Sequence, residues 1–182
     1  MKNKCLLFGM LFVGLFSVHA QKKNEVKMNF FNTLVIQSVE VGYEHFIEDG
    51  FSIGGELFIN DRYSYWPEIK KDGYKFNTNS VAVNANFYFS ANSSGYYISP
   101  MLKYRFGDFE EKKTDEVTQL DYIKKTDLDS FILGVGMGYK WVWNDHFAFA
   151  PYANINRNFS EDVNDRFWAV ELNAGLSLGY RF

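Results

Sequence analysis

The chain of 182 residues has a single cysteine, Cys5, which lies in an apolar N-terminal segment. The rest of the chain can therefore form neither a disulfide bond nor a metal site with thiolate ligands. Basic residues form no block, and the formal net charge is −3, which argues against nucleic acid as a partner. Beyond the N-terminal segment, no apolar stretch reaches the roughly 20 residues that a membrane helix needs. A membrane-spanning form of this chain would have to be a closed barrel.

The N-terminal segment is typical of a secretory signal peptide. Lys2 and Lys4 precede an apolar run that ends at Ala20, and this run is too short to cross a bilayer as a helix. We expect residues 1–20 to be removed and residues 21–182 to form one domain. Loss of the two lysines lowers the formal net charge from −3 to −5.

The region after the signal peptide alternates apolar and polar residues with a period of two, which indicates strands. The C-terminal segment is the clearest case, because the alternation continues without a break to Phe182. Eight segments with this pattern are predicted as strands: 26–33, 38–47, 51–62, 80–89, 96–109, 130–143, 147–159 and 168–182. An even number suits a bacterial barrel, and eight is the smallest size known. The pattern predicts an all-β fold, an eight-stranded antiparallel up-and-down transmembrane β-barrel.

The predicted connections alternate in length. The tight ones are 48–50, 91–95 and 144–146, and the long polar ones are 61–79, 110–129 and 160–167. The first connection, around residues 34–37, is short and rather apolar. Because membrane barrels have short periplasmic turns and longer outer loops, we expect both chain ends to face the periplasm. The connection 110–129 is predicted to be a solvated loop.

Residue size predicts which face points outward. The interior of an eight-stranded barrel is only just wide enough for its own side chains, so an inward face of Trp, Tyr, Phe and Leu would be overfilled. The opposite face offers glycine, asparagine and serine among a few charged residues. Its charges balance, four against four: Glu40, Glu44, Glu56, Lys103, Arg105, Lys140, Glu171 and Arg181.

Charges inside a narrow barrel have to be paired or hydrated, because an unpaired buried ion is costly. We expect a network of salt bridges and hydrogen bonds that closes the lumen. The alternative is a polar pore or a proton-sensitive gate. The network is expected to include five asparagines: Asn84, Asn86, Asn154, Asn156 and Asn173.

The connection 61–79 is the candidate contact surface, because binding residues concentrate on loops carried by a rigid scaffold. It combines aromatic and basic side chains, a composition that suits contact with lipopolysaccharide, a glycan or another protein. The candidate contact residues are Tyr63, Tyr65, Trp66 and Tyr74. The alternative is that these aromatic residues extend the strands and the outer aromatic girdle.

The ending from Gly175 to Phe182 resembles the C-terminal strand of small outer-membrane barrels of the OmpA and OmpX type. The resemblance implies that Tyr180 and Phe182 form the signal by which the barrel-assembly machinery recognises its clients. The segments Lys27-Met28-Asn29 and Val41-Gly42-Tyr43-Glu44-His45 resemble a Bacteroidota family of small barrels, DUF3575. That resemblance implies a location more than an activity.

Catalysis has to be considered, because two lipid A-modifying enzymes, a deacylase and a palmitoyltransferase, are also eight-stranded barrels. After the signal peptide the only histidines are His45 and His146, and no serine nucleophile can be placed within reach of either. We therefore expect no catalytic residue, no cofactor and no metal.

The sequence favours a barrel in the outer membrane of a Gram-negative bacterium, surrounded by lipid and lipopolysaccharide. Its expected role is structural, or a surface interaction with a protein or glycan through the outer loops. A lipid A-modifying enzyme and a soluble periplasmic barrel of the lipocalin kind are the alternatives.

Overall fold

A computed structural model describes residues 22–65, 68, 71–115 and 119–182. The expected signal peptide and Trp66 lie outside the described residues. The elements of the described part, in chain order, are β1 (Asn24–Asn29), α2 (Phe30–Ile36), β2 (Val39–Glu48), β3 (Phe51–Ile59), η1 (Tyr63–Tyr65), β4 (Tyr74–Ser90), η2 (Ala91–Ser93), β5 (Ser94–Thr114), β6 (Asp121–Asp127), β7 (Ser130–Trp143), β8 (Phe147–Asn158), α3 (Glu161–Asn164) and β9 (Val170–Arg181).

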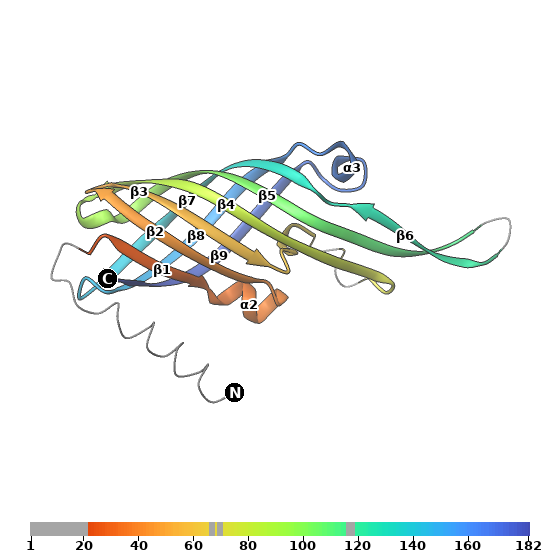
Figure 1. Ribbon diagram of the computed structural model, residues 1–182. Coiled ribbons are helices and arrows are strands. Elements are labelled where there is room, and N and C mark those ends of the chain that lie inside the picture. Colours follow the sequence, from red (N-terminus) through yellow and green to blue (C-terminus); the bar gives the residue numbers. More distant parts are fainter. Residues whose placement is uncertain (1–21, 66–67, 69–70, 116–118) are drawn as a thin grey trace, which may run out of the picture.

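Eight of the strands form a closed antiparallel ring in the order β1, β2, β3, β4, β5, β7, β8, β9 (Figure 1). The last strand closes the ring on the first, with a register that runs from Glu25 opposite Arg181 to Asn29 opposite Ser177. Every wall strand therefore has a hydrogen-bonded neighbour on both sides, and the ring has no free edge. The predicted all-β, eight-stranded antiparallel up-and-down barrel is confirmed.

The two ends of the barrel differ. The tight turns, which contain Gly50, Ser93 and Asp145, share one end with the C-terminus and the start of β1; we call it the turn end (Figure 1). The longer connections gather at the opposite end, which we call the loop end. The grouping of short and long connections predicted from the sequence is thus present.

The prediction that the first strand runs over 26–33 is wrong, because β1 ends at Asn29 and α2 follows at once. The Asn29 side chain accepts a hydrogen bond from the backbone N–H of Asn32 at 3.2 Å, as an N-cap does. The helix ends at Gln37, which has a left-handed conformation with φ 56°. The apolar residues of this segment thus belong to a short helix at the rim of the wall.

The prediction of a solvated loop over 110–129 is also wrong in its conformation. The far part of β5 pairs with β6 from Asp108 opposite Asp127 to Thr114 opposite Asp121, and this β5–β6 hairpin projects beyond the ring at the loop end (Figure 1). Gly107 marks the point where β5 leaves the ring. Its φ is 135°, and a Cβ there would lie 2.0 Å from the carbonyl oxygen of Asn77, so only glycine fits.

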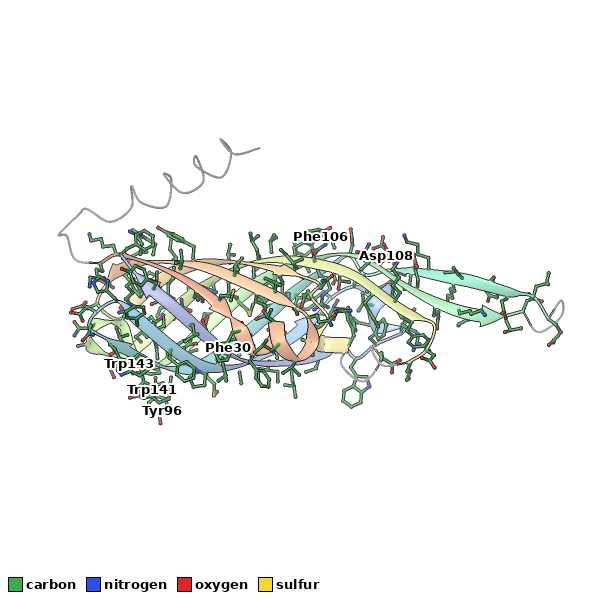
Figure 2. All side chains as sticks on the ribbon, turned by 90° about the horizontal axis from the view of Figure 1, so that it is seen from below. Phe30, Tyr96, Phe106, Asp108, Trp141 and Trp143 are labelled. Atoms are coloured by element: carbon green, nitrogen blue, oxygen red, sulfur yellow. The ribbon has the colours of Figure 1, made fainter. Side chains whose placement is uncertain are left out.

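The two faces of the wall have opposite chemistry. Large apolar side chains point away from the barrel around the ring, as Figure 2 shows for the side chains that it draws. Trp141, Trp143 and Tyr96 lie together near the turn end, and Phe106 lies near the loop end (Figure 2). Within the described part of the chain, no helix is long and apolar enough to cross a membrane.

Candidate functional site

The structure places the eight charged residues expected in the lumen inside the ring of strands. All of them except Glu56 are buried, and the Glu56 side chain is about one-fifth exposed. Their positions follow from the strand period, because each lies on the face opposite the large apolar residues of its own strand. They form a network in three levels, from the turn end to the loop end.

The level nearest the turn end is centred on Glu25. Lys140 donates to a Glu25 carboxylate oxygen at 3.0 Å and to Glu44 at 2.9 Å. Arg181 donates to the second Glu25 oxygen at 2.8 Å and to the backbone carbonyl of Ser93 at 2.7 Å. The last strand is thereby tied to the first strand, to β7 and to the turn between β4 and β5, so the turn end is closed by charged contacts.

The middle level is less highly charged. Lys27 pairs with Glu56 at 2.7 Å. Glu40 is held by neutral donors, since its carboxylate accepts from Asn29 at 2.8 Å, from Asn32 at 2.7 Å and from Tyr152 at 2.7 Å.

The level nearest the loop end is centred on Arg105, which is 0% exposed. Its guanidinium donates to both carboxylate oxygens of Glu171, at 2.6 and 2.8 Å, and to Asp61 at 3.2 Å. Lys103 pairs with the same Asp61 oxygen at 2.6 Å. A bidentate guanidinium–carboxylate pair has strict geometry, so it fixes β5 against β9 across the lumen.

The connection after β3 folds into this level. Arg105 also donates to the Tyr65 hydroxyl at 2.9 Å, which anchors η1 in the mouth of the barrel. Burial raises the pKa of the Asp61 carboxyl, but the positive charges of Lys103 and Arg105 lower it by more, so this pKa lies well below its usual range. Asp61 is therefore charged and balances the two cations.

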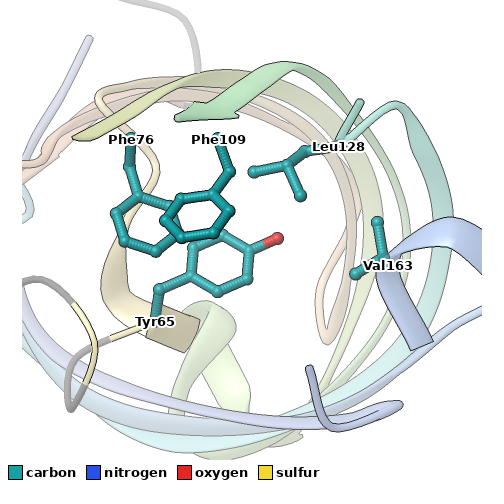
Figure 3. Close-up of a cluster of buried hydrophobic side chains, with 5 residues drawn as sticks. All are labelled: Tyr65, Phe76, Phe109, Leu128 and Val163. Atoms are coloured by element: carbon teal, nitrogen blue, oxygen red, sulfur yellow. The ribbon is translucent and has the colours of Figure 1, made fainter. Parts of the chain in front are cut away.

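Above the charged levels, aromatic and aliphatic side chains form a cap across the mouth of the barrel. It consists of Tyr65, Phe76, Phe109, Leu128 and Val163, which point toward one another inside the ring (Figure 3). The Tyr65 and Phe76 rings stack with their centroids 4.8 Å apart. The cap joins η1, β4, β5, α3 and the link between β6 and β7, so it closes the loop end.

The cap corrects the list of candidate contact residues. Tyr65 is only 2% exposed, and Tyr74 is half-buried against the cap, where its hydroxyl accepts a hydrogen bond from Arg166 at 3.0 Å. Tyr65 therefore closes the mouth and is not a free surface contact, whereas Tyr74 packs on the cap and keeps part of its side chain exposed. Tyr63 lies in η1, and Trp66 is outside the described residues.

Three charged members of the network were missing from the sequence-based list: Glu25, Lys27 and Asp61. The first two lie on the inward face of β1, and continuing its alternation back from Asn29 would have included them. Asp61 lies beyond the end of β3, where alternation gives no information. Its role depends on a connection that folds back into the barrel.

One of the five expected asparagines, Asn84, bonds a charged group directly, and two others are linked to the charged network through a neutral side chain. Asn84 donates to Glu56 at 3.0 Å, and Asn173 accepts from Asn32 at 3.4 Å. Asn86 donates to Ser52 at 3.1 Å, and that hydroxyl bonds Glu44. Asn154 and Asn156 occupy the space left by two inward glycines of β7, because a Cβ at Gly136 or Gly134 would collide with their side chains.

These side chains fill the lumen almost completely. A cavity in the middle level has a volume of about 50 Å³ and is lined by both polar and apolar residues, among them Lys27, Glu40 and Met101. Such a space suits a few water molecules that bond to its polar side chains. It has no room for an apolar ligand of lipid size.

The two described histidines are engaged near the turn end. A His45 ring nitrogen lies 2.9 Å from the Asn24 side-chain oxygen, and a His146 ring nitrogen lies 3.1 Å from the Arg181 carbonyl oxygen. Across the described ranges, no cluster of three or more histidine, cysteine or acidic residues could hold a metal ion.

A closed eight-stranded ring with a polar lumen and an apolar outer face is the arrangement of small outer-membrane β-barrels. The chain belongs to the family described as "Protein of unknown function (DUF3575)", whose model matches residues 6–155. A comparison with curated proteins found no match.

A search of solved structures found outer-membrane proteins among those similar to this chain. The N-terminal β-barrel domain of Pseudomonas aeruginosa OprF is 12% identical over 89% of this chain and 98% of that domain, with a TM-score of 0.48. Ail, the attachment invasion locus protein of Yersinia pestis, is 10% identical over 90% of this chain and 100% of that chain, with a TM-score of 0.46.

Proposed function

We propose that this protein is an integral outer-membrane β-barrel with a closed lumen, which serves as a rigid scaffold and presents its loop end for surface interactions. The main observation behind this proposal is the polarity of the two faces of the wall, which is the reverse of that in a soluble protein. The outward face is apolar, whereas the charged side chains lie inside and pair with one another. A bilayer favours that distribution, because its hydrocarbon core accepts apolar surface and excludes unpaired charge.

The filled lumen supports a scaffold over the two alternatives. A soluble barrel of the lipocalin kind needs a polar outer face and a roomy apolar cavity, whereas this barrel has an apolar outer face and a lumen filled largely by paired charged side chains. A lipid-modifying enzyme needs a base beside its nucleophile. Here the ring nitrogens of His45 and His146 lie within hydrogen-bond distance of an asparagine side chain and of a backbone carbonyl, respectively. We therefore propose that the barrel is not an enzyme, and expect lipid A of unchanged mass after its expression.

The β5–β6 hairpin is the part of the loop end that we propose for interactions with a protein or glycan. It projects beyond the ring and exposes Leu120, Tyr122 and Ile123 near its tip. Its charged groups pair across the strands, as Lys112 does with Asp121 at 2.7 Å, which holds the hairpin extended. A rigid projection presents its tip at a low entropic cost.

Heat modifiability on a gel tests the membrane barrel. The full chain, expressed in a Gram-negative host, should fractionate with the outer membrane and shift in mobility only after boiling, because a fully hydrogen-bonded ring resists detergent. Deletion of Phe182, the proposed end of the assembly signal with Tyr180, should abolish the shift. The matched control Leu120→Ser removes an exposed apolar residue outside the ring and should leave the shift intact. Recovery of the wild type in the soluble periplasm would refute the proposal.

A further inference from the structure

Arg157 is an exception on the outer face of the wall. Along β8 the outward positions are apolar from Phe147 to Ile155, and the next one is Arg157, which is exposed near the loop end. On β7, β8 and β9, strands that the structure describes in full, it is the one outward side chain with a charge. A lone guanidinium in an apolar belt is costly unless an anion accompanies it.

The protein itself supplies no such anion. Arg157 lies opposite Leu133 on one neighbouring strand and opposite Val170 on the other, so both cross-strand neighbours are apolar. It forms no ion pair with any residue in the described ranges. Its guanidinium lies 5.7 Å from the centre of the Phe159 ring, which leaves its hydrogen-bond donors open to an outside partner.

The surroundings of Arg157 have the composition of a membrane interface. Phe159, directly after β8, and Phe131 on β7 are both exposed, and a backbone hydrogen bond of 3.0 Å joins them. Trp168, which precedes β9, is 88% exposed. Aromatic side chains of this kind gather where acyl chains meet headgroups. Arg157 is therefore at the level where a lipid phosphate would lie if the loop end faces outward.

We infer that Arg157, with the aromatic rim of Phe131, Phe159 and Trp168, is a binding site for the phosphate of a membrane lipid in the outer leaflet. A guanidinium is suited to this ligand, because its planar donors match two phosphate oxygens. The rim packs on the acyl and sugar portions beside the phosphate. The inference rests on the proposed membrane location and adds to it the place and chemistry of one lipid contact.

Native mass spectrometry of the purified full-length barrel tests this site. The barrel is held in neutral detergent micelles with lipid A that carries its phosphates, and retained lipid is counted. Arg157→Gln should lower retention about tenfold, as expected for loss of a charge-assisted hydrogen bond. Arg157→Lys keeps the positive charge but lacks the planar arrangement of donors. Its lipid retention should lie between that of the wild type and that of Arg157→Gln. The matched control Lys125→Gln, which removes an exposed cation of the hairpin, should retain lipid like the wild type.

Three results would overturn the site. Arg157→Gln could retain lipid A like the wild type, lipid A stripped of its phosphates could bind equally well, or millimolar inorganic phosphate could displace the lipid. Heat modifiability of the same samples shows whether such a result refutes only the lipid site or also the proposed membrane barrel. Unchanged retention in a barrel that shifts on boiling refutes the site alone. A wild type that never shifts and stays out of the membrane refutes the scaffold proposal and the site with it.

Discussion

The lumen and the outer face of this barrel reverse the usual distribution of a soluble protein. Inside, charges lie in contact with charges, as in the pairs of Arg105 with Glu171 and of Lys140 with Glu25. Outside, long runs of apolar residues are exposed, with Arg157 as the exception on three consecutive strands. The difference shows that the polar groups of this barrel provide its specific internal contacts. The apolar groups face outward, where the proposed membrane location would surround them with lipid.

The largest expected effect comes from breaking the charged lumen. Arg105→Met removes a buried guanidinium and leaves Asp61 and Glu171 without it, which should lower the free energy of unfolding by about 3–5 kcal/mol. Urea unfolding of the barrel in micelles measures this. The control Lys75→Met removes an exposed member of an ion pair on the hairpin side and should have little effect. Equal stability of Arg105→Met and the wild type would show that the pairing is dispensable.

The next effect comes from placing a charge on the outer face. Met137 lies near the middle of β7, points outward and is 67% exposed. In a bilayer, Met137→Arg should cost about 2–4 kcal/mol, as for arginine at the bilayer midplane. Unfolding in lipid vesicles measures the loss, and the same substitution should be almost neutral if water bathes this face. Met137→Leu serves as the control for the change of shape.

The pH dependence of stability distinguishes the charged lumen from an apolar core. Because the pKa of Asp61 is depressed in the folded barrel, its contribution is complete above the unfolded value of about 3.9 and is lost as the pH falls toward the folded value. Asp61→Asn should therefore flatten the loss of stability below about pH 4. Ser80→Ala, which removes a hydroxyl bonded to Asp61 but keeps the carboxyl, should preserve the acid dependence. An identical acid slope in Asp61→Asn would contradict this assignment.

The smallest effect is expected on the β5–β6 hairpin, where the ion pairs are exposed to water. Hydrogen bonds from Lys112 and Thr114, together with the Lys112 charge, lower the pKa of Asp121. Lys112→Gln should return this pKa toward its usual range. It should leave unchanged the temperature to which a sample must be heated before the barrel unfolds. An NMR titration of Asp121 measures the first expectation and gel mobility the second. A pKa that does not move would mean that the pair seen in the hairpin is not formed in solution.

Much of the wall could be predicted from the sequence, because the period of two is a local property of each strand. The alternation of Val135 and Met137 with Gly136 assigns one face and then the other without any knowledge of the partner strand. It also assigned Lys140 and Glu171 to the lumen, although it could not say that the first pairs with Glu25 and the second with Arg105. Those pairs join residues 115 and 66 positions apart, and closure of the ring brings them together.

The loop end could not be predicted in the same way. Tyr65 is an aromatic residue in a polar connection, and its composition alone favours an exposed contact. Only the folding of η1 into the mouth, with Arg105 as hydrogen-bond donor and Phe76 as stacking partner, makes it a buried residue. The hairpin was missed because its charged and polar residues conceal the alternation, and its strands are held by pairing outside the ring.

The sequence by itself determined the eight wall strands, the direction in which their side chains point and the grouping of short and long connections. It could do so because strand periodicity and turn chemistry act over a few residues. The tertiary structure decided which charges pair, how the connections close the mouth and why Arg157 has no partner within the described chain. These properties depend on distances between residues far apart in the sequence, and closure of the barrel sets those distances.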